Sequence, residues 1–106
     1  MIISLVPHEV CILMPDGSLF RIKPSGDLAR VREIRRSFDL EGIPCVHFSY
    51  GPIEGLPDPQ PNVYYLVSSK VFIAASDRSD LLRVDTGPGC IRDSQGRTQA
   101  VSNLAC

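Results

Sequence analysis

The sequence predicts a β-dominated α+β fold: a small antiparallel barrel or sandwich of about seven or eight short strands with one short helix. Three observations favour this class. Short apolar runs of strand length recur along the chain, turns rich in glycine and proline separate them, and only one segment after Tyr65 carries a compact helical pattern. With 106 residues, 43% of them apolar and 22% charged, the chain is expected to form a single domain over residues 1–106.

Composition excludes several function classes. A net charge of -1 lacks the basic excess typical of proteins that bind nucleic acids or anionic membranes. The basic cluster within residues 30–36 also contains Glu33, so it is interpreted as a solvated strand face. No apolar stretch approaches the roughly 18 residues that cross a bilayer. The start, Met1–Val6, lacks the basic region of a signal peptide, so a cytosolic chain, or one carried in a larger particle, is expected.

The four cysteines are scattered, without a Cys-x-x-Cys pair or zinc spacing around the two histidines. This predicts reduced, structural thiols and no metal or other cofactor.

The N-terminal half is predicted to form two hairpins after a first strand within residues 2–6. Residues 9–14 and 19–23 have strand patterns on either side of a Pro-Asp-Gly-Ser turn. Both faces of residues 9–14 are apolar, as expected for a covered strand. Leu28–Phe38 fits both a strand and a helical stripe. We favour a strand because a short loop with a glycine joins it to the evident strand Cys45–Tyr50. A helix over this segment is the alternative.

The stretch from Val63 to Leu82 is expected to organise the fold. Val63–Val67 is continuously apolar, as in an inner strand. Ser68 or Ser69 is a suitable N-cap for a helix of about two turns, with Phe72 as its anchor. An extended segment, 81–84, follows.

Two further segments complete the predicted domain. Residues 51–62 carry four prolines, which predicts a stiff extended strap rather than a flexible linker. Residues 90–93 and 97–104 are predicted to pair as a closing hairpin around the turn Ser94–Gly96.

Several short motifs are spread over nearly the whole chain: Pro7-His8, Pro24–Gly26, Ala29–Val31, Gly42–Val46, Gly55–Pro61, Tyr65–Ser68, Asp77–Leu81 and Ile91–Gly96. Together these motifs resemble a family of small, largely uncharacterised proteins of tailed phages and prophage-bearing bacteria. The resemblance implies a bacterial virus–host setting and brings no catalytic residues with it.

Six residues are candidates for ligand binding. Ser68 and Ser69 open a helix and could hold a phosphate, although a simple helix cap is the favoured interpretation of these two residues. Two Arg/Asp turns border the central unit and offer arginine forks for phosphate or carboxylate groups. Adjacent tyrosines point to opposite faces of a strand, so one is expected to pack inside while the other is free to stack on a base. The candidates are Tyr64, Tyr65, Ser68, Ser69, Arg78 and Arg92.

These features predict a small non-enzymatic binding protein, homo-oligomeric and cytoplasmic in a bacterial host cell, that captures a small ligand such as a nucleotide-derived antiviral defence signal. The serines and arginines would face one shared hollow. One alternative is a structural protein of the virion or its assembly. Another is a nucleotide hydrolase that uses Asp80 or Asp93 with His8, although spacing alone shows no raised pKa.

Overall fold

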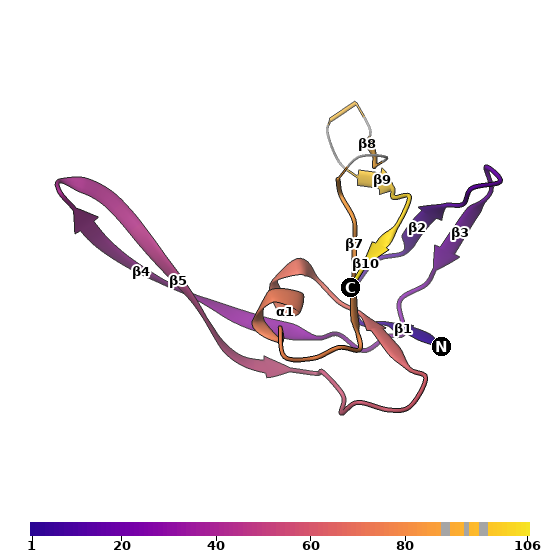
Figure 1. Cartoon of the computed structure of the whole chain (residues 1–106), viewed down its shortest axis with the longest axis horizontal. Coiled ribbons are helices and arrows are strands. Elements are labelled where there is room, and N and C mark those ends of the chain that lie inside the picture. Colours follow the sequence, from indigo (N-terminus) through magenta and orange to yellow (C-terminus); the bar gives the residue numbers. More distant parts are fainter. Residues whose placement is uncertain (88–89, 93, 96–97) are drawn as a thin grey trace.

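Figure 1 shows the computed structural model of the chain, which describes residues 1–87, 90–92, 94–95 and 98–106. Ten strands and one helix are formed by these residues. In chain order they are β1 (Ile2–Ser4), β2 (Val10–Leu13), β3 (Leu19–Ile22), β4 (Arg30–Leu40), β5 (Ile43–Glu54), β6 (Tyr64–Leu66), α1 (Ser69–Ala74), β7 (Leu81–Val84), β8 (Ile91–Arg92), β9 (Thr98–Ala100) and β10 (Leu104–Ala105).

A four-stranded sheet in the order β1-β6-β7-β10 forms the centre of the molecule. Both β1 and β7 run parallel to β6, and β10 closes the sheet antiparallel to β7. The β6-α1-β7 segment is therefore a small βαβ unit. The predicted β-dominated α+β class with one short helix is confirmed. The expectation of a purely antiparallel arrangement is wrong, and the sheets of the described residues do not close into a barrel.

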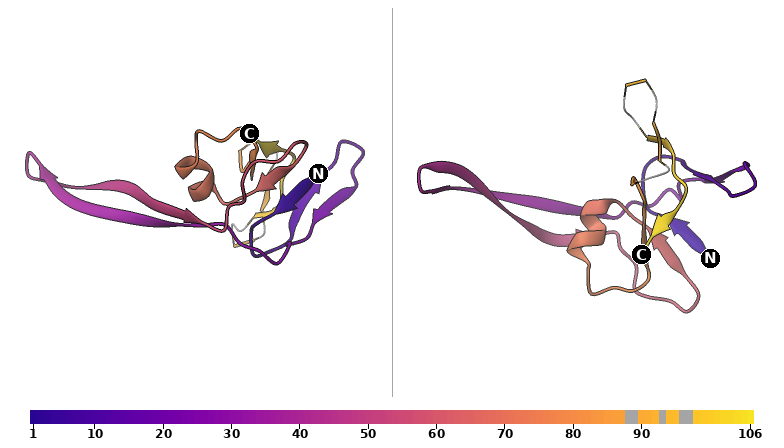
Figure 2. Two further views of the ribbon diagram at one scale, coloured as in Figure 1. Left: turned by 90° about the horizontal axis from the view of Figure 1, so that it is seen from below. Right: turned by 45° about the horizontal axis from the view of Figure 1, so that its top comes forward.

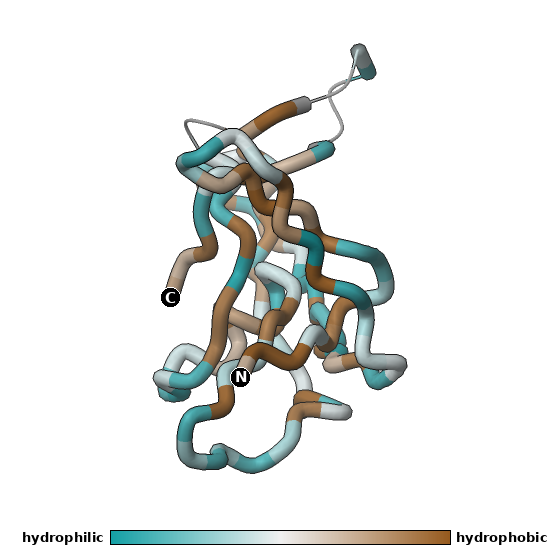
Figure 3. The backbone as a smooth tube through the Cα atoms, turned by 90° about the vertical axis from the view of Figure 1, so that its right-hand side faces the viewer, coloured by the Kyte–Doolittle hydropathy of each residue, from teal (hydrophilic) through white to brown (hydrophobic). Residues whose placement is uncertain are grey.

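The core consists of two apolar clusters, because successive residues of β6 point to opposite faces of the sheet. Tyr65 and Val67 pack with Val71 of α1 in one cluster, and Leu66 lies in the other. Figure 3 shows apolar stretches running through the middle of the molecule and polar ones at most of the outer loops. The prediction that Phe72 anchors the helix is wrong. Val71 is fully buried, whereas Phe72 is half-buried beneath the guanidinium of Arg83.

The hairpin of β2 and β3 has the predicted position, but its strands are less covered than expected. Leu19 and Phe20 of β3 are exposed, and three of the four residues of β2 are half-buried. The reason is that β2–β3 forms a sheet of its own, whose main neighbour is the short strand β9. Among the described helices, none is long and apolar enough to span a membrane.

Leu28–Phe38 lies mainly in a strand, as favoured. This strand, β4, pairs with β5 in a hairpin that we call the arm, residues 30–54. The arm extends away from the rest of the chain, to the left in Figure 1, and Figure 2 shows the same projection in two further views. It makes the molecule elongated, with extents of 53 × 37 × 21 Å and a radius of gyration of 16.2 Å, against about 13 Å for a compact chain of this length.

Candidate functional site

A hollow of about 130 Å³ lies beyond the carboxyl ends of β1 and β6. Both strands end at the same edge because they run parallel. Beyond that edge, the segment that follows β1 lies beside the start of α1, and the end of β7 lies across the hollow from them. In open sheets with parallel strands, ligands often bind at this edge. The lining residues are Val6, Pro7, His8, Val10, Leu66, Val67, Ser68, Ser69 and Val84.

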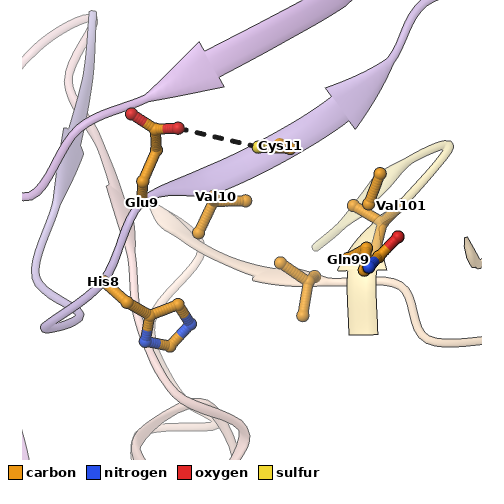
Figure 4. Close-up of a pocket in the computed structure, with 8 residues that line it drawn as sticks. His8, Glu9, Val10, Cys11, Gln99 and Val101 are labelled. Carbon is orange, nitrogen blue, oxygen red and sulfur yellow. Dashed lines mark hydrogen bonds between the residues drawn. The ribbon is translucent and has the colours of Figure 1, made fainter. Parts of the chain in front are cut away.

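A second hollow, of about 240 Å³, shares His8, Val10 and Val84 with the first. It extends along β2 towards β9, and its other lining residues are Glu9, Cys11, Gln99, Ala100 and Val101. Figure 4 shows the residues around His8 on one side and those of β9 on the other. The thiol of Cys11 donates a long hydrogen bond of 3.8 Å to a carboxylate oxygen of Glu9. We call the two hollows together the His8 site, because His8 contributes to both.

Ser68 is the N-cap of α1, as the sequence allowed. Its backbone is extended, with φ -68° and ψ 160°, and its Oγ accepts a hydrogen bond of 3.4 Å from the backbone N–H of Val71. The hydroxyl hydrogen of Ser68 is not used by this bond, so it can still be donated into the hollow. Ser69 follows as the first helical residue, and its side chain is exposed at the mouth.

Arg78 lies away from the His8 site, in the turn before β7, whereas the hollow lies at the other end of that strand. Its guanidinium forms a two-pronged ion pair with Asp80, with distances of 2.8 and 2.7 Å, and donates to the carbonyl of Pro57 at 2.9 Å. The hydrogen bonds from Arg78 lower the pKa of the Asp80 carboxyl. The expectation that Arg78 and the serines share one hollow is therefore wrong. Arg78 instead holds the proline-rich strap against the turn before β7, because its donors face Asp80 and Pro57.

The two tyrosines divide as predicted, one inside and one exposed. Tyr65 is 1% exposed within the core, so its ring is closed to a ligand. Tyr64 is 47% exposed, but it lies at the start of β6, opposite the edge that carries the His8 site. Neither tyrosine lines the two hollows. The backbone of Arg92 lies in β8, while its side chain and all of Asp93 fall outside the described part of the chain.

The sequence analysis did not select His8, Val84 or Gln99 as partners in one site. They come from three segments far apart in the chain, and only the pairing of β1 with β6 and the contact of β2 with β9 bring them together. Within the residues that the structure describes, no group of three or more His, Cys, Asp or Glu side chains has the geometry to hold a metal ion. No family model matches the chain, and no curated protein or solved structure matches it either.

Proposed function

We propose that this protein is a small non-enzymatic binding protein that captures a small ligand in the His8 site. The observation that carries the proposal is the pair of hollows that share one wall, with aliphatic side chains as the surface and a few polar groups at the mouth. Ligand sites in proteins have this composition: apolar walls that supply contact area, and a small number of polar groups that fix orientation.

The lining residues indicate the chemistry of the ligand. Val10, Val84 and Leu66 offer an apolar surface for a ring, and His8, Ser69 and the Ser68 hydroxyl offer hydrogen bonds. Neither lysine nor arginine lines the two hollows of the His8 site, so a polyphosphate would not be neutralised within them. Both volumes lie below the roughly 300–1,000 Å³ of sites for drug-sized molecules. We therefore propose that the site holds a nucleobase or nucleoside portion, with any phosphate directed into solvent.

The biological role that we propose is capture of a nucleotide-derived antiviral defence signal in the cytoplasm of a bacterial host. Two points support it. The sequence motifs resemble small phage proteins. The contact between a nucleophile and a base among the lining residues, from the thiol of Cys11 to the carboxylate of Glu9, is 3.8 Å long, beyond the roughly 2.6–3.2 Å expected for an activated nucleophile. A protein that only binds such a signal would lower its free concentration without chemical turnover.

Isothermal titration calorimetry with a panel of nucleosides, nucleoside monophosphates and cyclic dinucleotides tests this proposal. We expect at least one panel member to bind, with affinity lost in His8→Ala. The matched control is His47→Ala, because His47 is exposed on the arm and lies outside both hollows. The absence of heat for every panel member, or equal binding by both variants, would contradict the proposal.

A second function is favoured by a different observation, the arm, which leaves large apolar side chains exposed far from the core. Arms of this kind suit a structural protein that joins subunits in a virion or during its assembly. Mass spectrometry of purified particles distinguishes the two functions. A structural protein is present in fixed proportion to the other particle proteins, whereas a ligand trap is left in the host lysate.

A further inference from the structure

The outer part of the arm, residues 34–48, projects away from the core (Figure 1), and the guanidinium of Arg35 lies over the ring of Phe48 within the hairpin itself, 5.2 Å from the ring centroid. At its base, Val31 and Ile53 pack against the core, and Lys70 of α1 forms an ion pair of 3.3 Å with Glu33. Beyond that point most side chains are exposed. An isolated two-stranded hairpin is at best marginally stable in water, so an arm with this much exposed apolar surface is expected to be completed by another molecule. Its large exposed apolar residues are Ile34, Phe38, Leu40, Ile43 and Phe48.

The two edges of the arm differ in how well they can accept another strand. β5 contains Pro44 and Pro52, and its register is irregular opposite Arg32. Prolines and bulges protect an edge against pairing. β4 has eleven residues without proline or glycine, and the described structure pairs it only with β5. The open edge of β4 is therefore the one suited to β-strand addition.

The turn of the hairpin determines which backbone groups face that edge. Glu41 and Gly42 form a two-residue turn with φ of 51° and 83°. In such a hairpin the flanking pair exchanges both backbone hydrogen bonds, and every second residue along the strand then does the same. The intervening residues of β4, among them Arg35, Ser37 and Asp39, direct their N–H and C=O groups towards the open edge.

We propose that the partner is a second copy of this chain, whose β4 pairs antiparallel with β4 across a twofold axis at Ser37. The segment 34–40 is self-complementary about that residue. Two oppositely charged pairs, two aliphatic pairs and two arginine–phenylalanine pairs result, with the small serine side chains on the axis. The pairs are Arg35 with Asp39, Ile34 with Leu40 and Arg36 with Phe38, each formed twice, and Ser37 with Ser37 of the other copy.

The charged residues favour this strand pairing over the two alternatives in which the twofold axis passes through Arg36 or Phe38. Moving the axis to Arg36 places two arginines opposite each other and sets Glu33 against Asp39. Moving it to Phe38 replaces both pairs between Arg35 and Asp39 with Arg35 facing Glu41, which lies in the turn beyond the end of β4, so no charged pair remains between the strands themselves. About Ser37, it is Glu33 that faces this turn residue. Opposite charges on facing strands stabilise a sheet and like charges destabilise it, so the register about Ser37 is favoured. Ile34, Phe38 and Leu40 share one face of β4, and the resulting four-stranded sheet brings these residues of both copies onto a common face. A symmetric interface of this kind closes as a dimer.

Reciprocal charge reversal tests the proposal by sedimentation equilibrium. We expect the wild-type chain to dimerise and Arg35→Asp and Asp39→Arg each to weaken dimerisation about tenfold or more, because each change turns both charged pairs repulsive. Mixing the two variants restores opposite charges at both positions, so a heterodimer should form with wild-type affinity. The matched control is Arg30→Asp, which lies outside the paired segment and should dimerise normally.

Three results would overturn the proposal: a monomeric wild type, variants that still dimerise, or a mixture that fails to restore the dimer. A monomer that instead appears in fixed proportion with other proteins in purified particles would assign the edge to a different partner. Ligand binding at the His8 site is measured separately, since no residue of the arm lines the two hollows. The arm and the proposed ligand site can therefore fail independently.

The position of the axis is tested by oxidation of the Ser37→Cys variant. Facing residues in a hydrogen-bonded antiparallel pair have Cα atoms about 5.5 Å apart, which permits a disulfide. Peptide mapping by mass spectrometry should find the introduced thiol of one copy linked to the introduced thiol of the other, and Arg30→Cys should not form the equivalent bond. Dimers that link only through the exposed Cys106 would contradict the register.

Discussion

A short inner strand, β6, and a long edge strand, β4, have opposite environments in this protein. β6 has only three residues, yet it lies between two parallel neighbours with Tyr65 and Leu66 almost completely buried. β4 has eleven residues and pairs with a single partner, and most of its side chains are exposed. Length therefore does not indicate a strand's contribution to the core. The number of neighbours does, because burial on both faces and pairing on both edges remove the most apolar surface from water.

The same contrast shows how the molecule divides its tasks. The region around β6 is complete in itself and positions the His8 site at the ends of its strands. The arm is packed against the core at its base and mostly exposed beyond it, and we propose that its outer residues contribute to recognition more than to the fold. Substitutions chosen in matched pairs, one in each region, separate these roles.

The largest difference in stability is expected between truncation of a leucine buried in the core and truncation of a leucine exposed on the arm. Leu66→Ala removes a side chain that is 0% exposed, whereas Leu40→Ala removes one that is 59% exposed. Truncation of a buried leucine should lower the free energy of unfolding by about 2–5 kcal/mol, and that of Leu40 by less than about 0.5 kcal/mol. Urea unfolding measures both losses, in the Arg35→Asp background in which the arm is expected not to pair with a second copy. Similar losses would mean that the arm belongs to the core.

Glycines at the base and the tip of the arm give the next contrast. Both have left-handed backbone, with φ of 79° at Gly55 and 83° at Gly42. A Cβ at Gly55 would overlap the backbone carbonyl of Leu28, while one at Gly42 meets open space. Gly42→Ala should cost only the backbone strain, about 1 kcal/mol, and Gly55→Ala about 3 kcal/mol because backbone must also move. Thermal unfolding of both variants compares them, and equal shifts would contradict this geometry.

The ion pair between Arg78 and Asp80 predicts a pH dependence. Arg78 lowers the pKa of Asp80 in the folded chain, so the unfolded chain takes up the proton first as the pH falls. The stabilisation is present above the usual carboxyl pKa of about 4 and is lost as the pH falls through the lower, folded value.

Arg78→Ala should lower the free energy of unfolding at pH 7 by about 1–3 kcal/mol, because a half-buried carboxylate loses its partner. Urea unfolding at pH 7 and in acid should show a smaller acid-induced loss for Asp80→Asn than for wild type. Asp16→Asn is the control. The pKa of Asp16 is also lowered, by hydrogen bonds from Ser18, but this carboxylate is exposed at the tip of the β2–β3 hairpin and should matter less. An unchanged pH profile in Asp80→Asn would contradict the assignment.

The smallest contrast concerns the two serines at the start of α1. Ser68→Ala removes the N-cap bond to Val71 and should cost about 1 kcal/mol, whereas Ser69→Ala should be close to neutral for stability. Circular dichroism during thermal unfolding compares them. Equal losses would mean that the cap is not formed by Ser68.

Much of the local structure was predictable because its causes are local. The continuous apolar run at 63–67 indicated an inner strand, the serine pair indicated the helix start, and the Glu41–Gly42 turn favoured a strand before it. The split between Tyr64 and Tyr65 followed from the alternation of a strand. The prediction of Phe72 as the helix anchor was wrong, because the position of α1 over the sheet buries Val71 instead.

The candidate site depended on contacts between distant segments. Sequence order placed Arg78 close to Ser68, but β7 returns parallel to β6, so the turn before β7 lies at the opposite edge from the helix start. His8 entered the site only because β1 pairs with β6 and leaves its following residues beside α1. Local polarity and turn residues thus determined the strands and the helix of this protein. Which side chains share a hollow was decided by strand direction and order in the tertiary structure, because these bring segments that are distant in the chain, such as those around Leu5 and Val71, into one apolar cluster.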